Sequence, residues 1–237
     1  MDAAEYALMD AAEGRMWWYR ALHARLAGGL RDIRGRVLDA GCGTGGLLAA
    51  LRTQRPDLAR FGVEWDARAA VREREKSAAA MARGSVNALP FADNSFDAAI
   101  SADVLCHGAV DPAAALSELR RVLRPGGRLI VNMPAYQWML SAHDRRVHNV
   151  RRLTAPATAA MLVQAGFAGV TARYWNGLLL PLMIVQRKIL ARGDSVSDVA
   201  AFPPWLDVIL HCMTEIERRL PFPLPVGGSV LAIAEKP

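Results

Sequence analysis

The stretch Val37-Leu38-Asp39-Ala40-Gly41-Cys42-Gly43-Thr44-Gly45 decides the fold of this chain. Its apolar beginning is typical of a short buried strand, and leucines at positions 47, 48 and 51 then resume at helical spacing. Glycines between a strand and a helix allow a tight turn and let a ligand approach the backbone closely. Free amide groups at the start of the helix can donate hydrogen bonds to that ligand. The stretch therefore predicts a ligand site where the first strand runs into a helix.

A second apolar strand, residues 61–64, ends in the carboxylate of Glu64. Dinucleotide-binding folds place a ribose-binding carboxylate at about this interval after the glycine turn. Two acceptor oxygens suit the two hydroxyl groups of a ribose. Glu64 can equally be a surface carboxylate, but the strand before it favours ribose binding.

Strands and helices alternate along the chain, which favours a parallel, doubly wound α/β sheet. Helices are expected over the first thirty residues, after the glycine turn, after Asp66, from Asp111-Pro112, over 158–165 and over 205–220. The expected sheet is mostly parallel, with seven strands, an antiparallel strand at its C-terminal end and a helical cap. The strands are expected at 36–40, 61–64, 84–88, 96–102, 128–132, 169–175 and 229–234. We predict a single domain over 1–237, with an N-terminal helical segment (1–30), a ligand-binding core (36–132) and a cap (133–226).

The composition is that of an ordinary globular protein, with 237 residues, 52% of them hydrophobic, and a formal charge of +6. The arginines that carry the charge are spread along the chain, so a nucleic-acid partner is not indicated by charge alone. Three scattered cysteines form neither a disulfide framework nor a metal motif, which suits a reducing cytoplasm. The acidic, alanine-rich N-terminus lacks the pattern of a signal peptide. These features predict a cytoplasmic location.

Two further motifs follow the glycine turn in the chain. They are NALPFADNSFD at 87–97 and LRPGG at 123–127. With VLDAGCGTG, they make the chain resemble the class I, Rossmann-like methyltransferases that use S-adenosylmethionine (SAM) and release S-adenosylhomocysteine. The segment 16–19 and the MPAYQW stretch at 133–138 are similar to bacterial small-molecule methyltransferases that are mostly uncharacterised.

The resemblance implies SAM as cofactor and a set of residues that bind it. Glu64 would hold the ribose, with Trp65 beside it. The family often carries an Asp for the adenine, where this chain has Ser85, with Val86 next to it. Ala102 and Asp103 would border the donor methyl group, although Asp103 can equally cap a turn. The methionine part would lie against Asp39, Gly41, Cys42, Gly43 and Gly45.

Methyl transfer from a sulfonium is an in-line displacement that needs positioning of the nucleophile and exclusion of water. A base is needed when the acceptor is a hydroxyl or a protonated amine. The sequence has no metal-binding spacing, and no metal is expected. Candidate bases follow the fifth strand, namely His143 and His148, with Asp144 as an orienting carboxylate. Candidate acceptor contacts are Trp17, Trp18, Tyr19, His107, Tyr136 and Trp138.

The apolar segment 178–185 is too short to span a membrane. It can be core or subunit contact, a wall of the acceptor pocket, or an interfacial helix that meets anionic lipid. The helix expected after it has an apolar stripe of residues at helical spacing: Trp205, Val208, Ile209, Cys212, Met213, Ile216 and Leu220. The expected acceptor is a small or lipid-like molecule, with peripheral membrane contact as an open alternative.

Other functions share parts of this pattern. An NAD(P)-dependent oxidoreductase would use the same sheet, glycine turn and ribose carboxylate, but the two downstream motifs and the lack of a Tyr-x-x-x-Lys pair argue against it. A nucleic-acid methyltransferase is suggested by the basic charge, but residues 101–104 read SADV rather than an Asn/Asp-Pro-Pro-aromatic motif. A SAM-binding regulator without catalysis is a third alternative.

Overall fold

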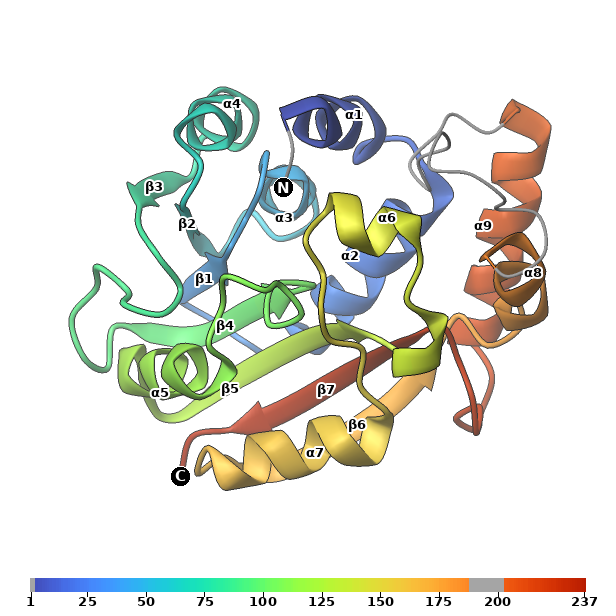
Figure 1. Cartoon of the computed structure of the whole chain (residues 1–237). Coiled ribbons are helices and arrows are strands. Elements are labelled where there is room, and N and C mark those ends of the chain that lie inside the picture. The colour runs from blue at the N-terminus through green and yellow to red at the C-terminus, as the bar shows by residue number, and fades with distance from the viewer. Residues whose placement is uncertain (1–2, 188–202) are drawn as a thin grey trace.

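The computed structural model describes residues 3–187 and 203–237, and its centre is a seven-stranded sheet (Figure 1). The strand order is β3-β2-β1-β4-β5-β7-β6. Strands β1 to β5 pair in parallel, and β7 pairs antiparallel with both β5 and β6. The expected doubly wound, mostly parallel fold with an antiparallel C-terminal strand is confirmed. The strands are β1 (Arg36–Ala40), β2 (Ala59–Glu64), β3 (Ala80–Arg83), β4 (Phe96–Ala102), β5 (Leu123–Pro134), β6 (Ala168–Trp175) and β7 (Ser229–Glu235).

Three of the described helices begin at a residue whose side chain caps the helix. Asp66 accepts hydrogen bonds from the amides of Arg68 and Ala69 at the start of α4, and Asp111 does the same for α5. Thr154 caps α7. The helices are α1 (Ala3–Ala12), α2 (Trp17–Gly29), α3 (Gly46–Gln54), α4 (Ala67–Ser77), α5 (Pro112–Val122), η1 (Gln137–Met139), α6 (Ala142–Arg146), α7 (Ala155–Gln164), α8 (Leu180–Val185) and α9 (Pro204–Arg218).

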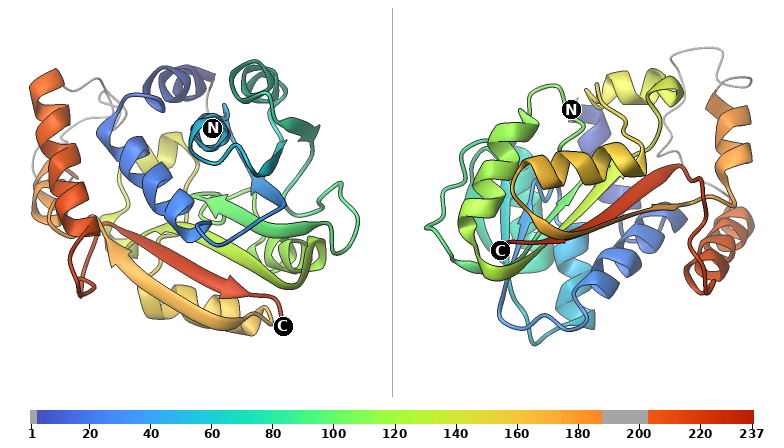
Figure 2. Two further views of the ribbon diagram at one scale, coloured as in Figure 1. Left: turned by 180° about the vertical axis from the view of Figure 1, so that it is seen from behind. Right: turned by 90° about the horizontal axis from the view of Figure 1, so that it is seen from below.

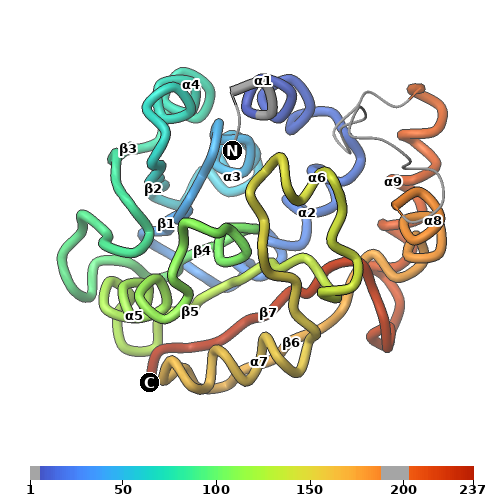
Figure 3. Tube along the Cα trace, viewed as in Figure 1, coloured from blue at the N-terminus to red at the C-terminus, as the bar shows by residue number. Residues whose placement is uncertain are grey.

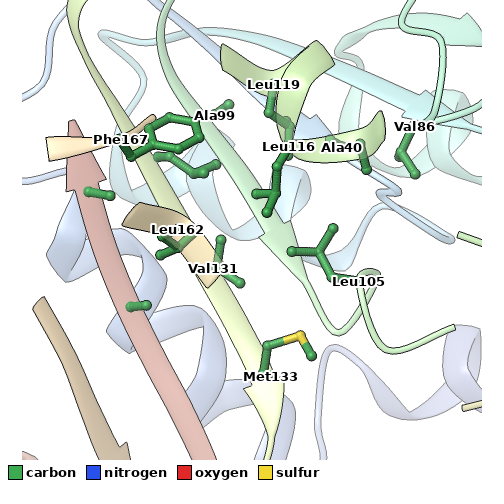
Figure 4. Packing of buried hydrophobic residues seen from close by; sticks show 14 of the residues in the cluster. Ala40, Val86, Ala99, Leu105, Leu116, Leu119, Val131, Met133, Leu162 and Phe167 are labelled. Carbon is green, nitrogen blue, oxygen red and sulfur yellow. The ribbon is translucent and has the colours of Figure 1, made fainter. Parts of the chain in front are cut away.

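Successive side chains of the central strands point to opposite faces of the sheet, and each face has its own hydrophobic core. Leu38 of β1 belongs to the core under α5 and α7, which Figure 4 shows with Leu116, Leu119 and Leu162. Its neighbour Val37 belongs to the core under α2 and α3 on the other face. The view from below in Figure 2 shows helices on both sides of the sheet. This double cover explains why the central strands read as almost wholly apolar.

Two local predictions were wrong. The first thirty residues form two helices, α1 and α2, rather than one. The third strand lies at Ala80–Arg83 rather than 84–88, and Ser85 and Ala88 make only an isolated bridge. The Ala-Met-Ala-Arg strand lacks the β-branched and aromatic residues that reveal a strand in sequence, and pairing with β2 supplies its conformation instead.

The chain after β5 divides between the sheet and its surroundings. Strand β6 joins the sheet and α7 packs against β6 and β7, whereas α8 and α9 lie at one end of the molecule (Figures 1 and 2). In the tube view, α1 lies beside α3 and α4, near the carboxyl ends of β1 and β2 (Figure 3). Among the described residues, no helix is both long enough and apolar enough to span a bilayer.

Candidate active site

A cavity of about 630 Å³ opens at the carboxyl ends of the central strands. Asp39 of β1, Glu64 of β2, Asp103 after β4 and Pro134 of β5 all line it. The strand order reverses direction between β1 and β4, and in open α/β sheets ligands bind outside the strand ends at such a point. The volume lies within the range of small-molecule sites.

The glycine turn after β1 forms one wall of the cavity. Gly41 and Gly43 have φ of +85° and +56°, a left-handed conformation that suits glycine. The amides of Gly41 and Cys42 both donate to the carbonyl oxygen of Val63, at 2.9 and 3.1 Å, which ties the turn to β2. The turn therefore presents backbone without side-chain bulk to the cavity.

Glu64 is fixed beside this turn by backbone donors. The amide of Gly43 donates to its Oε2 at 3.0 Å, and the amide of Asp66 donates to its Oε1 at 3.0 Å. The hydroxyl of Tyr6, on α1, donates to Oε1 at 3.2 Å. Burial, and then the charge of Glu64, raise the pKa of Tyr6, so the tyrosine stays a donor. The carboxylate has the position and the spare lone pairs to accept further hydrogen bonds from a ligand.

Asp39 is a buried carboxyl group that has no hydrogen-bond or ion-pair partner among residues 3–187 and 203–237. It is 3% exposed, lines the cavity, and accepts no hydrogen bond from the described residues. Burial, and then the charges of Glu73, Glu13 and Glu64, raise its pKa to about 8. Several acids therefore surround one end of the cavity, and a cationic ligand there would relieve their mutual repulsion.

Helix α1 covers the glycine turn and is held by polar contacts. A Cβ atom placed on Gly43 would lie 2.8 Å from the methyl carbon of Met9. Asp10 pairs with Arg72 of α4 at 2.7 Å and also with Lys76. Glu13 accepts from the Thr44 hydroxyl at 2.7 Å and pairs with Lys76 as well. These contacts make the N-terminal helix part of the cavity wall.

A chain of hydrogen bonds orients Asp103 on the other side of the cavity. The amide of Asn132 donates to both carboxylate oxygens, at 2.9 and 3.0 Å, and its own oxygen accepts from Trp175 Nε1 at 2.8 Å. Asp103 has φ of +54°, a conformation that Asp tolerates better than most residues. Burial raises its pKa to about 7, against the lowering effect of the Asn132 hydrogen bonds and the Arg152 charge.

Helix α6 brings His143 and Asp144 to the cavity in different roles. Asp144 is 1% exposed, closes a capping box with Ser141 and pairs with Arg152 at 2.8 Å and Arg187 at 3.2 Å. Burial opposes its ionisation, but the charges of Arg152 and Arg187 outweigh it and lower the pKa of Asp144. Asp144 is thus a structural carboxylate that anchors α6, while His143 lines the cavity.

The cavity brings together most of the residues singled out from sequence. Gly45, His148, Tyr136 and Trp138 are not among its lining residues. Gly45 begins α3 against Glu73, and Tyr136 stacks on Trp138 and Tyr174. Burial lowers the pKa of His107, which does line the cavity, to about 4. The other residues singled out from sequence also line it: Trp17, Trp18, Tyr19, Asp39, Gly41, Cys42, Gly43, Glu64, Trp65, Ser85, Val86, Ala102, Asp103, His143 and Asp144.

Other lining residues carry no signal in the sequence. Tyr6 and Met9 come from α1 and Glu13 directly follows it, and Met183, Gln186 and Arg187 come from α8 and the residues after it. Their helices belong to no motif, and only docking onto the sheet brings them to the cavity. In the part of the chain that the structure describes, no group of three or more His, Cys, Asp or Glu residues could hold a metal ion.

Part of the chain is similar to known methyltransferases. Residues 38–131 match the family model described as "Methyltransferase domain". Malonyl-[acyl-carrier protein] O-methyltransferase of Dechloromonas aromatica is 41% identical over 109 residues, covering 46% of this chain and 40% of that protein. Ubiquinone/menaquinone biosynthesis C-methyltransferase of Geobacter sulfurreducens is 35% identical over 105 residues, covering 41% of each. The match therefore spans less than half the length of these relatives.

The fold is similar to solved structures across almost the whole chain. A SAM-dependent methyltransferase of Thermotoga maritima, described as a possible histamine N-methyltransferase, aligns with a TM-score of 0.64. The alignment covers 99% of this chain and 95% of that one, at 19% identity. At this identity the likeness establishes the shared fold.

Proposed function

Because residues 38–131 carry a class I methyltransferase domain, we propose that this protein transfers the methyl group of SAM to an oxygen or nitrogen nucleophile of a small or lipid-like acceptor. The fold and the cofactor of this family agree with the cavity at the carboxyl ends of β1 and β4. The acceptor is the part of the proposal that only an experiment can identify.

The carboxyl groups near the glycine turn are the observation that supports SAM as the cofactor. Asp39, Glu64 and Glu13 line this end of the cavity. SAM brings a sulfonium and an ammonium group, and both would be stabilised beside these carboxylates. A dinucleotide would instead bring a diphosphate to the same turn, where these charges would repel it. The sign of the charge therefore favours SAM over NAD(P).

The residues present fit SAM along the wall formed by β1, β2 and β4. The unpartnered Asp39 carboxylate and the backbone of Gly41, Cys42 and Gly43 would hold the methionine part. Glu64 would accept from the ribose hydroxyls, with Trp65 beside it. The adenine and the donor methyl group would lie against Ser85, Val86, Ala102 and Asp103.

SAM supplies an electrophilic methyl group whose departure leaves a neutral thioether. The chain has to place the acceptor behind that methyl group, exclude water and accept a proton where the acceptor carries one. Asp103 suits the last task, because Asn132 fixes its orientation and its pKa of about 7 lets it take up a proton near neutral pH. His143 lines the same cavity from α6 and is the second candidate base.

Titration calorimetry with SAM, S-adenosylhomocysteine and NADH tests the cofactor. We expect binding of the first two and none of NADH, and the reverse result would end the proposal. Asp39→Asn should weaken SAM binding, whereas Glu75→Gln, which removes an equally charged group at an exposed position, should not. Labelled SAM incubated with cell extract, followed by mass spectrometry of the product, would then identify the acceptor.

A further inference from the structure

Most of the apolar stripe of α9 faces outward rather than into the core, and of its members Met213 packs against the buried cluster of Trp17, Leu179 and Leu210. Trp205, Val208, Ile209 and Ile216 are 65%, 56%, 48% and 60% exposed. The opposite side of the helix packs on α2, where Leu210 is buried with Trp17 and Leu179. Contiguous exposed apolar side chains on a folded protein mark an interaction site rather than random surface.

Helix α8 continues this surface toward the cavity. Leu178, Leu182 and Val185 are 40%, 49% and 40% exposed, while Met183 of the same helix lines the cavity. The amides of Asn176, Gly177 and Leu178 donate to the Glu217 carboxylate of α9, which joins the two helices. Figures 1 and 2 place α8 and α9 at the same end of the molecule. We call this surface the α8–α9 face, defined by Leu178, Leu182, Val185, Trp205, Val208, Ile209, Ile216 and Phe222.

The acidic groups of α9 do not contribute free negative charge to this face. Asp207 accepts from the Trp17 amide at 2.7 Å and pairs with Arg20 at 2.6 Å. Glu217 is 8% exposed, and Glu215 pairs with Arg218 at 2.5 Å. Arg219 follows Ile216 by three residues, in line with the stripe, and is exposed. The face is thus apolar with a basic end, on a chain whose formal charge is +6.

We infer that the α8–α9 face binds the surface of an anionic lipid bilayer. An apolar helix face of this kind inserts at the boundary between headgroups and acyl chains, and basic residues add attraction to anionic lipid. Aromatic side chains favour that boundary, and Trp205 and Phe222, which is 59% exposed, lie near the two ends of the stripe.

The arrangement also specifies the class of acceptor, a step that rests on the proposed function. Because α8 has one side on the face and the other in the cavity, a molecule with its apolar tail in the bilayer could place its polar end in the cavity. The acceptor is therefore a membrane-borne lipid with a hydroxyl or amino group in its polar part.

Sedimentation with vesicles tests the surface without any methyl transfer. The full chain is mixed with vesicles of phosphatidylglycerol and phosphatidylcholine in equal parts, or of phosphatidylcholine alone. We expect the wild type to bind the anionic vesicles, with an affinity that falls as salt is added. We expect V208E/I209E to bind these vesicles at least about tenfold more weakly than the wild type. The matched control is Val163→Glu, since Val163 lies on α7 away from this face and is 59% exposed.

Several results would overturn the inference. They are absence of wild-type binding, equal binding by V208E/I209E, or an equal loss in the Val163→Glu control. Light scattering in solution adds another, because a wild-type dimer that V208E/I209E dissociates would assign the face to a second copy of the chain. SAM titration of the same variants separates the two proposals: a chain that binds vesicles but not SAM keeps the surface and loses the cofactor. Methyl label from SAM should enter the lipid when the vesicles are made from a total lipid extract of cells, and its absence despite vesicle binding would refute the lipid acceptor.

Discussion

SAM affinity should rise with pH between pH 6 and pH 8, and Asp39 should cause the change. Burial and neighbouring carboxylates raise the pKa of Asp39 to about 8 in the ligand-free protein. The group is therefore about 99% protonated at pH 6 and about half protonated at pH 8. A cation bound beside it favours the ionised form, so binding at low pH must release a proton.

The magnitude follows from the two populations. When the bound cation lowers the pKa of Asp39 to well below 6, the apparent Kd at pH 6 should be about 50-fold higher than at pH 8. That ratio corresponds to about 2.3 kcal/mol of binding free energy. SAM affinity increases with pH because the ionised fraction of Asp39 increases. The affinity levels off above the pKa that Asp39 has in the ligand-free protein.

Calorimetry in buffers of different ionisation enthalpy measures both affinity and released protons. Asp39→Asn removes the titrating group while keeping nearly the same shape, so the protein should fold as before, and its SAM affinity should lose most of this pH dependence. The α-amino group of SAM itself titrates at about pH 7.7–8.0, and the difference between wild type and variant removes its contribution. Equal pH dependence in the two proteins would refute the electrostatic account of Asp39.

Three further outcomes are expected. Asp103→Asn should lower kcat by about a hundredfold or more with little change in SAM affinity. In the wild type, kcat/KM should rise with pH through about 7 as Asp103 loses its proton. A kcat/KM that does not change with pH would exclude Asp103 as the base. His143→Ala should slow turnover while calorimetry shows unchanged SAM binding, and full activity would remove His143 from the mechanism. Gly41→Ala should lower the unfolding free energy by about 3 kcal/mol, because φ is +85° and its Cβ would lie 2.5 Å from Val104 Cγ2. Gly126→Ala, with φ of +74° but nothing within 4 Å, should cost only about 1–2 kcal/mol in thermal or urea unfolding.

The sequence predicted what depends on local pattern. The turn at Gly41 and Gly43, the caps at Asp66 and Asp111 and the apolar central strands are each decided by a few adjacent residues. Their combination was enough for the sheet type and the position of the cavity. The third strand was misplaced because its residues have little strand propensity and take their conformation from β2.

The site was predictable only where it lies on those strands. Tyr6 reaches Glu64 across 58 positions of sequence, through the docking of α1. The Trp175–Asn132–Asp103 chain joins β6, β5 and the end of β4, and no spacing rule links these positions. Conversely, Asp144 was a plausible partner for its neighbour His143, but its carboxylate turns to Arg152 and the helix start instead. Adjacent residues on a helix point in different directions, so adjacency in sequence gave no support for a catalytic pair.

The orientation of α9 shows why an apolar stripe does not by itself define a core face. Periodicity establishes that Trp205, Val208 and Ile216 share one side of a helix, and this is correct. The packed side is decided by the polar residues opposite, since Asp207 and Glu217 accept from backbone amides of other segments that would otherwise lack partners. Rotating the helix to bury the stripe would break those hydrogen bonds and leave the backbone amides of Trp17, Asn176 and Gly177 without their acceptors, at a cost of several kcal/mol. Among the described residues the stripe therefore stays exposed to water, and a partner surface would cover it.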